Sequence, residues 1–425
     1  MIKIYKDAAE ALKRGEGDVR RDEKIRDSVA EIIAAVRRDG DRALYEYARL
    51  FDGTELSSLE VTGEEIDRAA ASCGGDLLRV MERAAENIRD FHSRQVRLPF
   101  SFEKGGAVMG QKITPIERVG LYVPGGTAAY PSSVLMNCIP AKIAGCSKIV
   151  MVSPPSRGGD IAPAILAAAK IAGVDRVFRV GGAQAVAALA YGTETVPKVD
   201  KIVGPGNAYV AEAKRQVFGR VAIDMIAGPS EILVIADELS DPAVVAADLL
   251  SQAEHDRMAS AILLTDSEKL ASAVSAELER QLPLLPRYEI ARESIDTRGK
   301  IVVCPDIASC VRLSNEMAPE HLELFVDSPF DWLDAVKNAG SIFLGRSCPE
   351  ALGDYMAGPN HTLPTSGTAR FSSPLSVDDF IKKSQFTYFT PDDLDALADD
   401  VAAFARAEGL EAHAESVLSR KNGDR

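Results

Sequence analysis

The sequence predicts an α/β protein with two Rossmann-like halves and small extensions at both ends. Short β-branched apolar runs that end in Gly or Pro alternate with Ala-rich helical segments from about residue 118 to 375. The apolar character of these runs is continuous, which is typical of parallel strands covered on both faces. A second series of such runs begins at Glu231, so we expect two sheets.

Length and charge restrict the class further. The 425 residues suffice for two or three domains whose cores need no metal or disulfide. With 49 Lys+Arg against 63 Asp+Glu the formal charge is −14, which disfavours nucleic acid and anionic membranes as partners. The start lacks the apolar core of a signal peptide, and no apolar run reaches the length of a membrane span. Six cysteines without a C-x-x-C pair indicate reduced thiols, so we expect a cytoplasmic protein.

The first hundred residues are expected to be helical. Apolar residues recur at helical spacing over residues 27–51, and Thr62 with Glu65 forms a capping box that begins another helix. A longer helix is expected over about 77–94, with His92 on the surface. Strands are then expected at 119–126, 148–155, 176–182, 201–206, 231–237, 260–266, 300–306, 321–326 and 341–345. Helices are expected between them, at 132–144, 161–172, 183–191 and 208–217 in the first half.

After about Leu375 a hairpin-like stretch precedes acidic helices. A terminal unit of about 50 residues is too small to be stable alone. We therefore expect it to pack on another domain or on another subunit.

Glycine-containing turns follow several expected strands. Such turns let the backbone approach a phosphate at a helix N-terminus. None matches a G-x-G-x-x-G or Walker A pattern, so a nucleotide site is indicated by their clustering, and a plain structural turn is the alternative at each. The turns are Gly125-Gly126, Gly181-Gly182, Gly204-Pro205-Gly206 and Gly228-Pro229-Ser230.

Two polar pairs are candidates for metal binding and proton transfer. Gln252 and His255 lie one helical turn apart on one face, a spacing that can offer two ligands to zinc. A solvated helix end is the alternative. Glu320 and His321 can act as a base for water and a proton shuttle, provided that the turn after Pro319 lets them converge. A structural histidine beneath the sheet is the alternative.

The remaining candidates are less specific. Asp354 is either a ligand or a turn residue. Glu408 and His413 are about 140° apart on one helix, so they share a face only if Gly409 ends that helix and another begins; a solvated tail is the alternative. Cys138 is the best-placed thiol for aldehyde chemistry, but it lacks a neighbouring base and fits a buried hydrophobe better. His361 receives no role.

Motifs over nearly the whole chain resemble the histidinol dehydrogenase family. They are, in order, RVGLYVPGG, VGGAQAVAALAYGT, VGPGNAYV, IDMIAGPSE continuing to DLLSQAEHD, APEHLEL, GDYMAGPNHTLPT and EGLEAH. The resemblance implies two aldehyde-dehydrogenase-like α/β/α domains in an intertwined homodimer. It also implies oxidation of L-histidinol through the aldehyde to L-histidine, with one Zn²⁺ per subunit and two NAD⁺ consumed.

The resemblance also implies roles for individual residues. Zinc ligands fall on Gln252, His255, Asp354 and His413. Glu320 and His321 take the acid/base positions. Ser230 and Glu408 join His321 and the zinc ligands around the substrate. NAD contacts fall on Tyr122, Gln184 and Asn207. Glu408 and His413 are expected to complete the active site of the other subunit.

The implied domains are an N-terminal extension (1–20), a catalytic domain (21–121 and 237–375), an NAD-binding domain (122–236) and a C-terminal dimer-exchange unit (376–425). The sequence has two other interpretations. One is a related zinc dehydrogenase with another hydroxylated substrate. The other is a metal-dependent hydrolase, although the hydrolase motif H-E-x-x-H is missing from the sequence. A non-catalytic interaction protein would not need several polar clusters of this kind.

Overall fold

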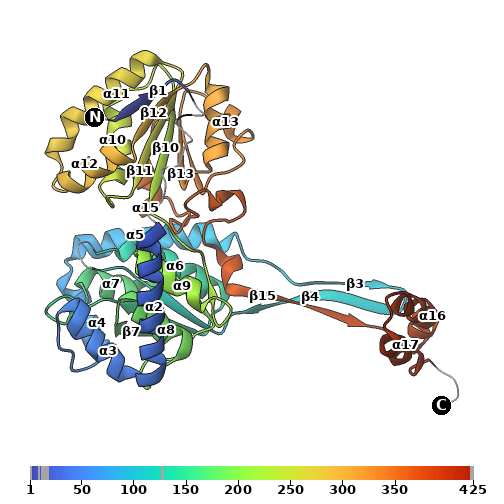
Figure 1. Ribbon diagram of the computed structural model, residues 1–425. Coiled ribbons are helices and arrows are strands. Elements are labelled where there is room, and N and C mark those ends of the chain that lie inside the picture. Colours follow the sequence, from blue (N-terminus) through green and yellow to red (C-terminus); the bar gives the residue numbers. More distant parts are fainter. Residues whose placement is uncertain (1, 8–9, 11–18, 126–128, 422–425) are drawn as a thin grey trace. The chain divides into compact units, whose positions relative to one another are not determined.

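The computed structural model describes residues 2–7, 10, 19–125 and 129–421 (Figure 1). Gly126 of the first expected turn and most of the expected N-terminal extension lie outside these residues. The chain divides into two compact units. Unit 1 comprises Met1–Gln95 and Glu117–Phe380, and unit 2 comprises Val96–Ile116 and Ile381–Arg425. None of the described helices combines the length and apolar character that a membrane span requires.

Sheet A of unit 1 has six parallel strands within the described residues, in the order β1-β12-β11-β10-β13-β14. They are β1 (Lys3–Tyr5), β10 (Glu231–Ala236), β11 (Ser260–Thr265), β12 (Lys300–Val303), β13 (His321–Phe325) and β14 (Ser341–Leu344). Ile232–Ala236 are all buried, because alternate side chains of β10 enter separate apolar cores on the two faces. The predicted parallel sheet covered on both faces is thus confirmed for this half.

Helices supply those two cores. One face of sheet A packs against α10, α11 and α12, and the other packs against α13. The helices of this half are α10 (Pro242–Ala253), α11 (Glu268–Gln281), α12 (Tyr288–Thr297), α13 (Ile307–Met317), α14 (Phe330–Leu333) and α15 (Glu350–Tyr355). Short 3₁₀ turns occur at Leu282–Leu284, Thr368–Arg370 and Val377–Phe380.

Sheet B of unit 1 has the order β2-β7-β6-β5-β8-β9 within the described residues, and its edge strand β2 is antiparallel to its neighbour. The strands are β2 (Glu60–Val61), β5 (Arg118–Tyr122), β6 (Lys148–Ser153), β7 (Arg176–Arg179), β8 (Lys201–Val203) and β9 (Ala222–Ile223). The associated helices are α2 (Val19–Asp39), α3 (Asp41–Tyr47), α4 (Gly63–Ser72), α5 (Gly75–Ser93), α6 (Pro131–Ala144), α7 (Pro163–Ala172), α8 (Gly182–Tyr191) and α9 (Ala208–Val217). Between α3 and β2 the chain forms a π-helical turn, Ala48–Asp52.

The N-terminal helices pack with sheet B. Val29 and Leu44 share one apolar core with Val152 and Phe178, and α2 packs on α8 and α9. The domain prediction grouped residues 21–121 with the catalytic half, and this packing differs from that grouping. The division into a catalytic and an NAD-binding domain stays a prediction.

Local predictions within these helices had different outcomes. The capping box of Thr62 and Glu65 is present at the start of α4, as predicted. The surface position predicted for His92 was wrong, because His92 is 0% exposed. Its Nε2 atom lies 3.3 Å from Nδ2 of Asn360, and that same amide nitrogen donates to the Met136 carbonyl oxygen at 2.6 Å.

Unit 2 joins two distant segments into one antiparallel sheet of order β15-β4-β3, formed by β3 (Phe100–Lys104), β4 (Ala107–Pro115) and β15 (Ile381–Tyr388). Two helices follow, α16 (Pro391–Ala407) and α17 (Glu411–Leu418). Gly409, at φ +77°, separates them, as the spacing of Glu408 and His413 required. The predicted terminal unit of 376–425 therefore lacked β3 and β4, which pair with β15.

Candidate active site

A cluster of buried polar side chains surrounds His321 at the amino end of β13. His321 is 4% exposed, and its Nδ1 atom donates to the Glu231 carbonyl oxygen at 2.9 Å. Nε2 of Gln252 lies 3.1 Å from the same ring nitrogen. The opposite ring nitrogen, Nε2 of His321, has no hydrogen-bond partner among the described residues. It lies 3.8 Å from Asp354 Oδ1 and 3.9 Å from Glu350 Oε1, so this side of the ring faces carboxylates.

Glu320 converges with His321, although they are neighbours in the chain. The turn before β13 contains Ala318 at φ +51°, and it brings Glu320 Oε2 to 3.6 Å from Nδ1 of His321. The backbone N–H of Glu231 donates to the same carboxylate oxygen at 2.8 Å. The convergence that the pair required is therefore present.

Burial and charge shift the pKa values of this pair. Burial raises the pKa of Glu320 to about 8, and the nearby His321 opposes this shift. Burial would lower the pKa of His321, but the carboxylates of Glu320, Asp354 and Glu350 outweigh it and raise the pKa to about 10. Both side chains thus change protonation above neutral pH, in the range where a base and a proton shuttle can work.

The carboxylates beside His321 form a potential metal-binding group. Among the described residues, ligand atoms of His321, Glu350 and Asp354 lie within 4.8 Å of one another. Burial alone would raise the pKa of Asp354, but the imidazole of His321, 3.8 Å away, and the charges of His361 and His255 lower it to about 2. Asp354 is therefore an ionised acceptor close to three imidazoles.

Of the predicted ligands of unit 1, Asp354 belongs to this group and Gln252 contacts His321, whereas His255 is outside the group and interacts with Asp354 through its charge. Oε1 of Gln252 is buried and has no hydrogen-bond partner among the described residues, so an oxygen donor is left free beside the histidine. Burial lowers the pKa of His255, and the neighbouring Asp354 opposes that shift. A neutral imidazole, an ionised carboxylate and a free amide oxygen form a donor set that fits a divalent metal such as zinc.

Glu350 was missed by the sequence analysis. It lies four residues before Asp354 in α15, so that spacing places both carboxylates on one helical face and could have identified it. Ser251 Oγ donates to its Oε2 atom at 3.1 Å. The backbone N–H of Glu350 donates to Oε1 of the buried Glu323 at 2.7 Å, which fixes the start of α15.

The predicted NAD contacts lie at the carboxyl ends of strands in sheet B. Tyr122 ends β5, Gln184 lies in the first turn of α8 after β7, and Asn207 follows β8 and caps α9. The Tyr122 hydroxyl accepts from the Gly182 N–H at 3.0 Å, and burial raises the pKa of Tyr122 to about 12. Because β5, β6, β7 and β8 are parallel neighbours, these residues share one edge of the sheet.

Ser230 lies next to Glu231, the backbone partner of Glu320 and His321, whereas the candidate residues of unit 2 remain unplaced relative to this group. Ser230 directly precedes β10, and its carbonyl accepts from Ser260 N–H at 3.0 Å. Glu408 and His413 are exposed on unit 2, so their part in the site stays a prediction. Cys138 is buried, and burial raises its pKa to about 12, which fits a packed thiol and not a nucleophile.

His361 adjoins the cluster although it received no role from the sequence. Its Nδ1 atom lies 3.7 Å from Asp354 Oδ1, and its Nε2 atom lies 3.3 Å from Ser133 Oγ on α6. The imidazole thus connects the helix that follows β5 to the carboxylate at the predicted metal position.

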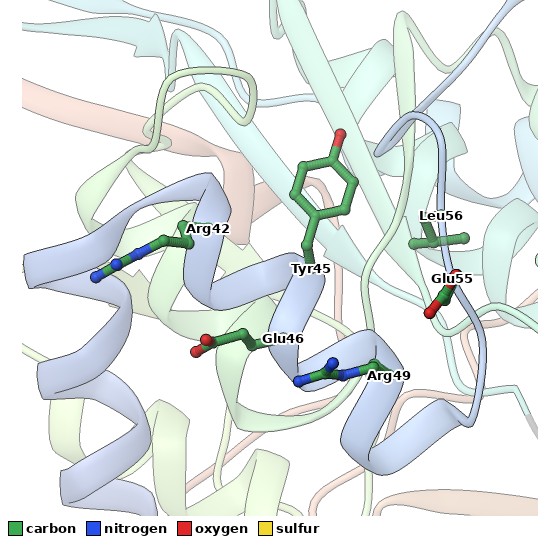
Figure 2. A pocket seen from close by; sticks show the side chains of 6 residues that line it. All are labelled: Arg42, Tyr45, Glu46, Arg49, Glu55 and Leu56. Carbon is green, nitrogen blue, oxygen red and sulfur yellow. The ribbon is translucent and has the colours of Figure 1, made fainter.

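One hollow of unit 1 is away from the predicted site residues, and a second borders the His321 cluster. A surface hollow in the N-terminal helical region has a volume of about 770 Å³, and none of the predicted site residues lines it. Figure 2 shows the side chains that line it. Its lining residues are Arg42, Tyr45, Glu46, Arg49, Glu55 and Leu56. A smaller one of about 160 Å³ is lined in part by Glu231 and Ser366. Since Glu231 is the hydrogen-bond partner of Glu320 and His321, the smaller hollow borders the cluster.

The comparisons with known proteins agree over both units. A family model described as histidinol dehydrogenase matches residues 16–421. The chain is 56% identical over 400 residues to the histidinol dehydrogenase of Bacillus cereus, covering 94% of this chain and 93% of the relative. Identity to the Clostridium acetobutylicum enzyme of that name is 53% over 412 residues, with 97% and 95% covered. The crystal structure of histidinol dehydrogenase from Elizabethkingia anophelis matches with a TM-score of 0.91 at 39% identity, covering 99% of this chain and 98% of that one.

Proposed function

Because the chain belongs to the histidinol dehydrogenase family, the NAD-dependent oxidoreductases of histidine biosynthesis, we propose that it oxidises L-histidinol through L-histidinaldehyde to L-histidine at the cluster around His321. The observation that carries this proposal is the pair of converging buried groups, Glu320 and His321, beside Gln252, His255 and Asp354. The closeness of these side chains supports a base, a proton shuttle and metal ligands within one site.

The electron count sets the order of events. Oxidation of a primary alcohol to a carboxylic acid removes four electrons, and each NAD⁺ accepts two of them as hydride. Two NAD⁺ molecules therefore bind in succession while the aldehyde stays in place. Tyr122, Gln184 and Asn207 are the residues proposed to contact each cofactor.

His321 handles the proton in both oxidations. Its Nε2 atom has no hydrogen-bond partner among the described residues and faces the carboxylates, so it is available to a substrate hydroxyl. When hydride leaves the carbinol carbon for NAD⁺, Nε2 accepts the hydroxyl proton, which requires the imidazole to be neutral at that moment. The Glu231 carbonyl holds the other ring nitrogen as the donor, which fixes the tautomer.

Glu320 prepares the second oxidation. The C–H hydrogen of an aldehyde leaves readily as hydride only after water has added to the carbonyl carbon and formed a gem-diol. Once deprotonated, the Glu320 carboxylate accepts a proton from that water, and its pKa of about 8 makes it a stronger base than an exposed glutamate. His321 then accepts the diol proton as the second hydride leaves.

The family implies a metal, and we propose Zn²⁺, one per subunit, held by Gln252, His255 and Asp354 together with His413. When bound, the ion supplies an anchor for the imidazole and amino nitrogens of the substrate, which fixes the position of the reacting carbon. Two observations on the side chains of unit 1 support this ligand set. Asp354 is kept ionised by its histidine neighbours, and Gln252 Oε1 has no hydrogen-bond partner among the described residues.

We propose further that the enzyme is a cytoplasmic homodimer in which Glu408 and His413 act in the site of the other subunit, with Ser230 and Glu408 contacting substrate. Unit 2 supports this, because every residue of β3 is exposed and Phe100, Phe102 and Phe404 are all more than half exposed.

Mixing two inactive variants, His255→Asn and His413→Asn, tests the shared site. Co-refolded heterodimers should regain activity through one intact site per dimer, and an inactive mixture would contradict sharing.

Stoichiometry tests the proposed reaction directly. Purified protein with limiting L-histidinol and excess NAD⁺ at alkaline pH should form two NADH per histidinol, and the product should be L-histidine. One NADH per alcohol would indicate an enzyme that stops at the aldehyde. No NADH from histidinol, with NADH formed from another alcohol, would assign a different substrate.

A further inference from the structure

A buried ion pair encloses one residue of the turn after β8. Lys214, on α9, is 2% exposed in its side chain, and Asp224, just after β9, is 1% exposed; the two are in direct contact. Lys214 Nζ donates to the carbonyl oxygen of Gly204 at 3.0 Å, and the backbone N–H of Gly204 donates to Asp224 Oδ2 at 2.7 Å. The pair therefore holds both backbone polar groups of Gly204, and the three residues form a closed ring of interactions.

This turn has no room for adjustment on its other side. Gly204 has φ +114°, and a Cβ atom there would lie 2.1 Å from the carbonyl oxygen of Tyr122. Asn207, three residues later, caps α9 through its Oδ1 atom, which accepts from Tyr209 and Val210 N–H at 3.1 Å each. A shift of Gly204 would therefore move the short segment that leads to the Asn207 cap, and it would bring Gly204 against Tyr122 at the end of β5.

A buried ion pair is not by itself evidence of a gain in stability. Removing two charges from water costs several kcal/mol per ion before their attraction is counted, and apolar pairs of similar volume are often as stable. An apolar pair, however, would leave the N–H and C=O of Gly204 without these partners, and buried backbone groups need partners. The ion pair holds the turn in one conformation, which is a function of geometry and not of stability.

We propose that Lys214 and Asp224 are positioning residues for the cofactor: by clamping Gly204 they fix the turn that presents Asn207 to NAD. The inference rests on the proposed function, since that function places NAD at Tyr122, Gln184 and Asn207. Neither side chain touches the cofactor in this role, because both are buried beneath the turn. Their effect is on the affinity for NAD and not on the chemistry of histidinol.

Lys201 provides a matched control. It lies on the adjoining strand β8, is also buried, and its Nζ atom contacts Asp379 Oδ1 at 3.0 Å and donates to the Asp379 carbonyl at 2.8 Å. Lys201→Met therefore removes a buried lysine that pairs with an aspartate but does not touch the Gly204 turn. Any effect that comes from losing a buried, paired lysine appears in both Met variants, although the Asp379 side chain is 29% exposed and that of Asp224 only 1%.

The experiment compares Lys214→Met, Lys201→Met and the double variant Lys214→Met/Asp224→Asn in the full-length protein. NADH fluorescence gives the Kd for the cofactor, steady-state kinetics give KM for NAD⁺ and for histidinol, and urea unfolding gives stability. For Lys214→Met we expect the Kd for NADH and the KM for NAD⁺ to rise about tenfold, with KM for histidinol and kcat changed by less than about threefold. For Lys201→Met the Kd should stay within about twofold of wild type.

The double variant separates positioning from stability. It removes both charges, so its urea midpoint should recover towards wild type, whereas its Kd for NADH should stay raised because the Gly204 carbonyl has lost its lysine donor. A double variant that binds NADH like wild type, one that does not fold, or a Lys201→Met effect as large as that of Lys214→Met would overturn the inference. Wild-type protein that binds NADH without oxidising histidinol would contradict the proposed substrate and leave this comparison valid.

Discussion

The carboxyl edge of sheet B and the amino edge of sheet A carry different kinds of residues. At the sheet B edge, glycine turns and helix caps predominate, and charged groups such as Lys214 and Asp224 are paired with each other. At the sheet A edge, imidazoles and carboxylates crowd together, and the buried atoms Gln252 Oε1 and His321 Nε2 have no hydrogen-bond partner among the described residues.

The difference indicates what each edge is prepared to receive. An edge whose charged groups are already paired within the protein can bind and release a cofactor without rearranging those groups, which suits a site that NAD must visit twice. An edge with free buried donors and acceptors is incomplete, because such groups are costly until something pairs with them. A metal and a substrate rich in nitrogen would complete it.

The largest effect should follow from leaving the sheet A edge incomplete. His255→Asn, which removes one proposed metal ligand, should lower zinc content and reduce kcat/KM for histidinol by about a thousandfold, because several kcal/mol of positioning and charge stabilisation are lost. The Kd for NADH should change by less than about twofold, since the other edge is untouched. Metal analysis and fluorescence titration of one preparation check both parts, and full activity in a zinc-free variant would refute the metal's role as anchor.

A smaller and more selective effect is expected within the same edge. Glu320→Gln should slow oxidation of histidinaldehyde by about a hundredfold and affect oxidation of histidinol less, because hydration of the aldehyde needs the carboxylate as a base. In wild type, kcat/KM for the aldehyde should rise as pH increases through about 8, where Glu320 loses its proton, and the variant should lack this rise. Equal losses in both half-reactions would refute the division of roles between Glu320 and His321.

Loss of Tyr122 from the sheet B edge should have a weaker effect, because its contact with Gly182 is a single neutral hydrogen bond. Tyr122→Phe removes the acceptor for the Gly182 N–H and should raise KM for NAD⁺ by about fivefold with kcat nearly unchanged. Steady-state kinetics with saturating histidinol measure this. A fall in kcat as large as the rise in KM would mean that Tyr122 acts on the chemistry, and the contrast between the two edges would then fail.

Local sequence predicted the central strands of both sheets because each is a continuous apolar run that ends in a turn residue. It could not predict strands whose partners are distant. β1 joins sheet A only through pairing such as Ile4 with Ile301, and β4 meets β15 through Gln111 and Gln385. A three-residue strand has no pattern of its own, and the exposed β3 carries no buried face to recognise.

The candidate site shows the same limit. Local sequence left a structural role open for both polar pairs, Gln252 with His255 and Glu320 with His321. The resemblance to a family was needed to favour a functional role. Glu350 had a usable signal in its spacing from Asp354, but nothing local indicated that its carboxylate would be buried. Burial depends on which elements pack together. The amphipathic patterns of α2–α5 did not indicate that α2 and α3 would share a core with sheet B, or that α4 would pack on α7 and α5 on α6.

The smallest effect on activity is expected at His92, which on α5 contacts Asn360 beside His361. Burial lowers the pKa of His92 to about 4. The unfolded chain therefore binds a proton near pH 6.5 that the folded chain refuses until about pH 4, so stability present above pH 6.5 is lost as pH falls through this window, by about 3 kcal/mol for this group. Glu320, with its raised pKa, has the opposite effect on the pH dependence of stability, since its contribution to stability falls as pH rises from about 4.5 to 8.

The His92→Gln variant isolates the contribution of the histidine. Urea unfolding of both proteins at pH 7 and pH 4.5 should show a smaller pH dependence in the variant, at nearly unchanged kcat. An identical pH dependence would mean that His92 titrates in the folded protein as it does in the unfolded chain, and that the contact between α5 and Asn360 does not exclude the proton.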